Sequence, residues 1–75
     1  MGIFATTIEI TTTDDGTLPE GYLFASFKNE GNQEALVNGV PLKPGAAKSY
    51  PFVGKGREAL DYQTQGTTLS IMYDY

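Results

Sequence analysis

The sequence contains no cysteine, no histidine and no tryptophan, and only five of its 75 residues are basic. Without cysteine the chain cannot form a disulfide or bind zinc through thiolates, and without histidine it lacks the commonest transition-metal ligand. The missing imidazole also excludes a nucleophilic triad that uses histidine as its base. We therefore expect a protein that is not an enzyme, with no catalytic residues, no cofactor and no bound metal.

The acidic excess, a net charge of −4, argues against nucleic acid as a direct partner. Affinity for nucleic acid depends on clustered Lys and Arg side chains that neutralise phosphates, and the basic residues here are scattered. No apolar run approaches the length that spans a bilayer, so no membrane association is expected. The N-terminal segment MGIFATTIEITTT also lacks the basic start and long apolar core of a secretory signal. These features favour synthesis in a cytoplasm.

The chain is short enough that its core is marginal, and we assign residues 1–75 to a single β domain. A domain of this size buries only about 60% of its unfolded surface. Natural domains of this kind often add a disulfide, a metal or a partner subunit. With the first two excluded, we expect association with copies of itself or with a larger protein assembly.

Residues 29–52 carry two reverse-turn signals and no helical period. Asn38-Gly39 lies between two apolar triplets, and this pair favours a type I′ hairpin turn because both residues tolerate positive φ. Lys43-Pro44-Gly45 predicts a type II turn, in which Pro presets φ and Gly supplies the positive φ. Pro41 and Pro51 cannot donate a ladder hydrogen bond, so we expect their strands at sheet edges.

Alternation of polar and apolar residues predicts the remaining strands. It is clearest in the first and last strands, residues 3–13 and 67–75, and we expect these two strands to pair. Further strands are predicted over residues 22–28 and 49–53, whereas residues 14–21 are predicted to form a loop of turn residues. Residues 59–64 are compatible with a strand or with a short turn of helix.

The spacing of roughly six or seven short strands, with turns between them, is typical of an all-β fold, a small antiparallel β-sandwich or barrel. The expected core consists of inward-facing apolar residues. They are Ile8, Ile10, Leu23, Phe27, Val37, Leu42, Phe52, Leu60, Leu69 and Ile71.

Two loops contain residues that suit ion binding. Asp14, Asp15 and Glu20 surround a glycine, and a Ca²⁺ site is one interpretation, but the spacing does not match an EF-hand loop and Asp-Asp-Gly is common in solvated turns. Residues 54–57, Gly-Lys-Gly-Arg, are compatible with a small anion-binding nest. A mobile surface loop is the favoured interpretation, with Lys55 and Arg57 available to a partner.

The five tyrosines give an alternative function, a small glycan- or ligand-binding β module. Tyrosines displayed together on one face stack on sugar rings. The combination that we expect is Tyr50 and Tyr62 with Tyr73 or Tyr75, and Tyr22 is a further candidate.

Two segments, NEGNQEALVNGVPLKPGAAKSYPF and YQTQGTTLSIMYDY, together resemble accessory virion proteins of tailed and other bacterial viruses. In such proteins an Asn-Gly hairpin and a Pro-Gly turn precede a strand with alternating Tyr and Phe, and an alternating aromatic strand ends the chain. The resemblance implies a structural or adaptor protein of a bacteriophage capsid, vertex or tail, located in the virion and without enzymatic activity. It supplies no functional residues.

The aromatic C-terminal strand predicts where the chain associates. A strand that remains apolar to Tyr75 would fray unless something covers it, either the first strand of the same chain or a neighbouring subunit. Tyr73 and Tyr75 suit a half-buried contact because tyrosine has an apolar body and a polar tip. We therefore expect an interface at Tyr73 and Tyr75 with Met72, and a contribution from Lys55 and Arg57.

Overall fold

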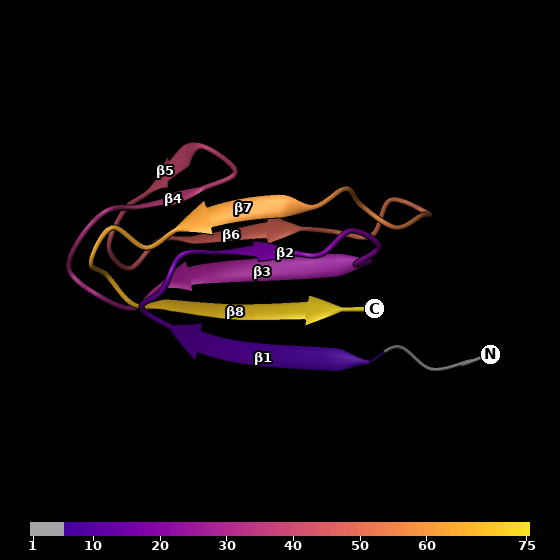
Figure 1. Cartoon of the computed structure of the whole chain (residues 1–75), viewed down its shortest axis with the longest axis horizontal. Helices are drawn as coiled ribbons and strands as arrows, with labels where there is room; N and C mark the ends of the chain where they lie inside the picture. The colour runs from indigo at the N-terminus through magenta and orange to yellow at the C-terminus, as the bar shows by residue number, and fades with distance from the viewer. Residues whose placement is uncertain (1–5) are drawn as a thin grey trace.

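The chain folds into two antiparallel four-stranded sheets that pack as a β-sandwich (Figure 1). The computed structural model describes residues 6–75, in which there are eight strands and no helix. The strands are β1 (Thr7–Thr12), β2 (Gly16–Leu18), β3 (Phe24–Asn29), β4 (Ala35–Val37), β5 (Val40–Leu42), β6 (Ala47–Tyr50), β7 (Leu60–Gln63) and β8 (Leu69–Asp74). Sheet A has the order β1-β8-β3-β6, and sheet B has the order β2-β7-β4-β5. The predicted all-β fold is confirmed, and the architecture is a sandwich.

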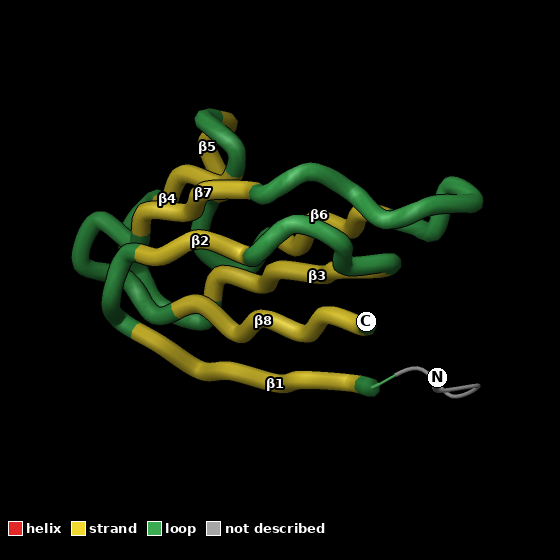
Figure 2. The backbone as a smooth tube through the Cα atoms, turned by 45° about the vertical axis from the view of Figure 1, so that its right-hand side comes forward, coloured by secondary structure: helices red, strands yellow, loops and turns green. Residues whose placement is uncertain are grey.

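The first and last strands pair, as their alternation predicts. In the β1–β8 ladder Ile10 lies opposite Ile71, and on its other side β8 pairs with β3, where Phe27 lies opposite Ile71. The last strand is therefore a central strand of sheet A (Figure 2). Thr6 and Tyr75 extend the β1–β8 ladder by exchanging backbone hydrogen bonds of 3.1 and 2.9 Å.

The predicted turns have the expected backbone geometry. Asn38 and Gly39 have φ values of 53° and 74°, and positive φ at both residues matches a type I′ turn between β4 and β5. Gly45 has a φ of 78°, and the amide of Ala46 donates to the carbonyl of Lys43 at 2.9 Å. A type II turn contains this hydrogen bond, in which the N–H of the fourth residue donates to the carbonyl of the first.

The two prolines predicted to lie in edge strands, Pro41 and Pro51, are placed where a missing N–H does little harm. Pro41 is in β5, which is an edge strand of sheet B, and Pro51 directly follows β6, which is an edge strand of sheet A. The prediction of edge positions is confirmed.

Some predicted strand boundaries are wrong. The strand predicted over residues 49–53 is β6, which ends before Pro51, so Phe52 leaves the sheet and is 59% exposed instead of lying in the core. The predicted loop over residues 14–21 contains β2, whose Leu18 pairs with Leu60 of β7. A strand of three residues is too short to show alternation. Residues 59–64 contain β7, a strand, and positions 3–5 lie outside the described residues.

The core lies between the two sheets and includes most of the expected residues. Ile8 and Ile10 of edge strand β1 are half-buried against it, and Leu23 is partly exposed just before β3. Leu18 and several small or aromatic residues are also buried, although they were not expected in the core: Tyr22, Ala25, Ala35, Tyr62 and Tyr73. Alternation places Ala25 beside Phe27 and Tyr73 beside Ile71 on the inward face.

Candidate functional site

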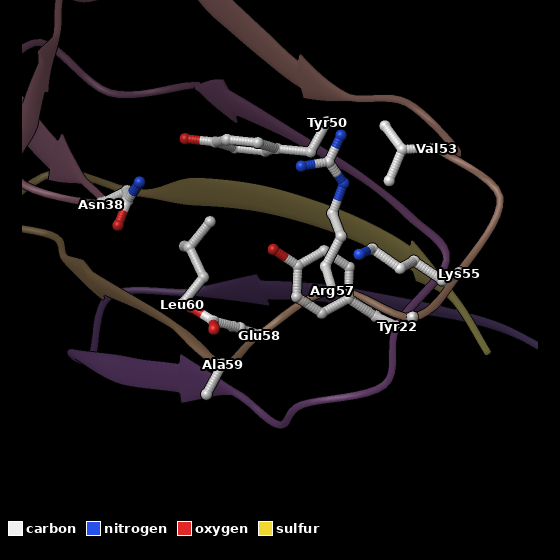
Figure 3. A pocket seen from close by; sticks show the side chains of 10 residues that line it. Tyr22, Asn38, Tyr50, Val53, Lys55, Arg57, Glu58, Ala59 and Leu60 are labelled. Carbon is white, nitrogen blue, oxygen red and sulfur yellow. The ribbon is translucent and has the colours of Figure 1, made fainter.

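A groove opens beside β6, where the loop between β6 and β7 lies against Tyr22 and Tyr50 (Figure 3). Its volume is about 540 Å³, and we call it the Tyr50 groove. The loop extends beyond the ends of the neighbouring strands (Figures 1 and 2). Polar lining residues come from three parts of the chain: Tyr22, Asn38, Tyr50, Lys55, Arg57 and Glu58.

Arg57 is held in place by its backbone and by its side chain. Its amide donates to the carbonyl of Tyr22 at 2.9 Å, and its carbonyl accepts from the amide of Gly21 at 2.7 Å. The guanidinium donates to the carbonyl of Pro51 at 2.7 and 3.2 Å and lies 5.7 Å from the centre of the Tyr50 ring. Of the two cations in the alternative interpretation as an anion nest, Arg57 is therefore engaged within the chain, and Lys55 is exposed.

The two tyrosines of the groove differ in their environments. Tyr22 is almost fully buried, and this burial raises the pKa of its phenol although the nearby Arg57 cation acts in the opposite direction. The Tyr50 ring packs edge-on against Phe27, with ring centres 6.0 Å apart. Its hydroxyl oxygen is buried and finds no hydrogen-bond partner among the described residues. A buried hydroxyl without a partner costs free energy, so a ligand atom that reached it would gain a hydrogen bond.

The Tyr50 groove offers groups that suit the binding of a ligand or a partner. Its described lining side chains include aromatic rings, cations and a single carboxylate, Glu58. The groove therefore has the composition of a contact surface.

One carboxylate of the acidic loop, that of Asp15, is hydrogen-bonded within the fold. Oδ1 of Asp15 accepts the amide of Thr64 at 2.9 Å, and the Thr64 hydroxyl donates to the carbonyl of Thr13 at 2.7 Å. Within residues 6–75 no three acidic side chains are placed to hold a metal ion. The structure therefore does not bring Asp14, Asp15 and Glu20 together as a calcium site.

The tyrosines expected to stack on sugars are not displayed together on an exposed face. Tyr62 and Tyr73 are core residues, each 8% exposed, and Tyr50 is half-buried. Tyr75 is 39% exposed and its ring packs at a tilt against Tyr73. The expectation of a sugar-stacking platform built from these residues is wrong, because the inward face of β7 and β8 buries two of them.

The residues expected at an interface do not come together on one surface. Tyr73 is buried by its own chain, with β1 and β3 on either side of β8. Met72 lies on the outer face of sheet A, in a shallow depression of about 230 Å³. Lys55 and Arg57 line the Tyr50 groove. Met72, Tyr73 and Asp74 take part in both ladders of β8, so these positions also hold the fold together.

A surface that the sequence did not single out is the outer edge of β1. Thr6 and Tyr75 exchange two hydrogen bonds, and hydrogen-bonded pairs alternate with non-bonded pairs in an antiparallel ladder. The register therefore directs the N–H and C=O groups of Ile8, Ile10 and Thr12 toward β8. The same groups of three residues point away from β8 and pair with no described strand: Thr7, Glu9 and Thr11.

The other edges of the sandwich are short or contain proline. β2 and β5 have three residues each, β5 contains Pro41, and β6 has four residues and is followed by Pro51. β1 has six residues, without Pro or Gly. The threonine alternation of β1 was the available signal, because β-branched residues stiffen an extended edge.

The described part of the chain, residues 6–75, has no helix that is both long and apolar enough to cross a bilayer. Comparison of the chain with protein-family models, with curated proteins and with solved structures found no match. The proposed function therefore rests on the geometry of the Tyr50 groove and of the outer edge of β1.

Proposed function

We propose that this protein is a non-catalytic structural or adaptor subunit that assembles with copies of itself or with a larger protein shell. The observation that carries the proposal is the open edge of β1, six residues long, in a sandwich whose other edges are short or end at proline. Unpaired edge strands are sites of pairing with other chains, and proteins commonly block the ones that they do not use.

The size of the domain supports the same proposal. The core is small, and the sequence has no cysteine with which to add a disulfide. Phe52 and Val53, 59% and 55% exposed, give the loop between β6 and β7 an apolar surface that a partner would cover. A bacteriophage capsid, vertex or tail, where an accessory protein is held at high local concentration, is the setting that we propose, so the protein would be located in the virion.

Sedimentation velocity over a range of concentrations tests the proposal. We expect the sedimentation coefficient to rise with concentration in the micromolar range, or a shell protein to co-purify from the native source. A protein that stays monomeric at high concentration and brings down no partner would contradict the proposal.

A second candidate function is binding of a small ligand or glycan in the Tyr50 groove. The observation that favours it is the buried Tyr50 hydroxyl, which has no hydrogen-bond partner among the described residues, on a ring whose centre lies 5.7 Å from the Arg57 guanidinium. Titration with a panel of neutral and acidic sugars, followed by amide chemical shifts, would perturb residues 53–60 if the groove binds them. Tyr50→Phe should then weaken the binding, and absence of any shift for the whole panel would remove this candidate.

A further inference from the structure

We infer that β1 pairs antiparallel with β1 of a second copy of this chain, about a two-fold axis at Ile10, so that the two copies of sheet A become one continuous sheet. This inference rests on the proposed assembly function and specifies its partner, its edge and its register.

The free backbone groups restrict the possible registers. Only Thr7, Glu9 and Thr11 present both N–H and C=O at the open edge, so each of them must lie opposite one of the same three positions in the second copy, or opposite its continuation at position 5 or 13. A two-fold axis can therefore lie at residue 8, 9 or 10.

Charge disfavours the axis at Glu9. That register would place the Glu9 carboxylate directly opposite Glu9 of the second copy, and like charges at opposite positions destabilise a strand pair. The axis at Ile10 instead places Glu9 opposite Thr11 of the second copy, and Thr11 opposite its Glu9. No charge is then opposed by a like charge.

The chain already uses threonine–carboxylate pairs across strands at two places. Thr7 lies opposite Asp74, and its hydroxyl donates to Oδ1 at 2.6 Å. Thr17 lies opposite Asp61, and the corresponding distance is 2.7 Å. A Thr11–Glu9 pair across the new ladder would repeat this arrangement twice by symmetry.

The inward face of β1 supports the same register. Ile8 and Ile10 are only half-buried, because β1 has a neighbour on one side alone. With the axis at Ile10, this residue lies opposite its own copy, and Ile8 lies opposite Thr12 of the second copy. With the axis at Ile8, Glu9 would lie opposite Thr7, whose only hydroxyl proton is already donated to Asp74. The register at Ile10 instead places Glu9 opposite Thr11, a threonine that does not make this bond.

Single-cysteine variants of the cysteine-free full-length chain test the register. Opposite residues of a non-bonded antiparallel pair have Cα atoms about 4.5 Å apart, within the range that a disulfide bridges. Under mild oxidation, Ile10→Cys should form a covalent dimer, whereas Glu9→Cys and Ile8→Cys should form little. A dimer formed mainly by Ile8→Cys or Glu9→Cys would overturn the register.

Exposed substitutions test the edge without touching the core. Thr11→Glu places two carboxylates opposite each other and should weaken assembly about tenfold. The exchanged double variant Glu9→Thr with Thr11→Glu restores threonine–glutamate pairing and should recover the affinity of the unmodified protein. Circular dichroism checks that each variant keeps its fold.

The outcomes separate this inference from the proposed function. If Thr11→Glu assembles with unchanged affinity, the β1 edge is not the interface and the inference fails, while the assembly function stands. If the unmodified protein is monomeric at every concentration, self-pairing is wrong. Recovery of a shell protein from the native source then decides the proposed function.

Discussion

The two edge strands of sheet A, β1 and β6, differ in length and in the backbone groups that they leave open. β6 stops at Tyr50, and the next residue, Pro51, accepts hydrogen bonds from the Arg57 guanidinium through its carbonyl. β1 runs for six residues and leaves the backbone groups of Thr7, Glu9 and Thr11 open. One edge of the sheet is thus short and ends at a proline, whereas the other edge is longer and leaves the backbone groups of three residues open to a partner.

The two sides also differ in how they are attached to sheet B. On the β6 side, the fully buried Asn29 at the end of β3 donates from Nδ2 to the carbonyls of Gln33 and Leu42, at 2.6 and 3.0 Å. Its Oδ1 accepts from the Gly31 amide at 3.1 Å and the Thr67 hydroxyl at 2.7 Å. All four side-chain hydrogen-bonding positions of this asparagine are occupied. β1 is joined to the sandwich by its ladder with β8 and by the half-buried Ile8 and Ile10.

The largest expected effect comes from placing proline in β1. Ile10→Pro removes a ladder hydrogen bond to β8 and an apolar side chain, and it should lower the free energy of unfolding by about 3 kcal/mol or more. Glu9→Pro removes an N–H that points away from β8, so it should cost much less, and it places a proline at the β1 edge as Pro51 does at the end of β6. Urea unfolding of the dilute monomer measures both variants.

The same pair of variants separates folding from assembly. Glu9→Pro should stay folded and fail to assemble. If it assembles as the unmodified protein does, β1 and β6 do not differ in the way described.

A second prediction concerns the attachment of the β6 side. Asn29→Ala leaves the carbonyls of Gln33 and Leu42 and the hydroxyl of Thr67 without their partner, and it should cost about 2 to 3 kcal/mol of stability. The matched control is Asn32→Ala at an exposed turn position, where a change within about 0.5 kcal/mol is expected. Thermal or urea unfolding would show the difference, and equal effects of the two substitutions would argue against a structural role for Asn29.

Alkaline pH should lower the free energy of unfolding through Tyr22, which bonds to the loop after β6 through its backbone. Burial raises the pKa of Tyr22 above its ordinary value, so the unfolded chain loses this proton at a lower pH than the folded protein does. The stability contribution is therefore complete below about pH 10 and is lost as the pH rises through the folded-state pKa of Tyr22. Burial raises the pKa of Tyr62 in the same direction.

Unfolding free energies measured from pH 8 to pH 11 test this dependence. Tyr22→Phe should reduce the loss of stability above about pH 10, and a slope that is unchanged in this variant would contradict the assignment.

The smallest expected effect is at the exposed face of β1. Thr7→Val removes the hydroxyl that donates to Asp74 and should cost about 0.5 kcal/mol in the dilute monomer. Thr17→Val, which removes the equivalent bond to Asp61 in sheet B, is the matched comparison. Thr7→Val should leave assembly intact, because the backbone groups of position 7 stay in place.

Features that depend on residues close together in the sequence could be predicted, whereas features that depend on the arrangement of the two sheets could not. The Asn38-Gly39 turn and the alternating strands follow from residue-level preferences for positive φ and for a two-residue period. The hydrophobicity of Phe52 predicts a core position, and this prediction is wrong. β6 ends before Pro51, so Phe52 lies outside the sheet and is exposed.

The candidate surfaces were harder to predict because they depend on which strands lie at edges. The sequence indicated that Pro41 and Pro51 close their edges, but the open edge of β1 follows only from the register with β8 and the sheet order. The bonding of Asn29 likewise joins Gly31, Leu42 and Thr67, which come together only in the folded sandwich.

Amide hydrogen exchange along β1 tests the central claim most directly, because alternate residues serve as internal controls. In a dilute sample the N–H groups of Ile8 and Ile10, which are bonded to β8, should exchange slowly, and those of Thr7, Glu9 and Thr11 should exchange fast. At concentrations where the protein assembles, the amides of Thr7, Glu9 and Thr11 should become protected as well. An assembled sample in which these three amides still exchange fast would contradict the account.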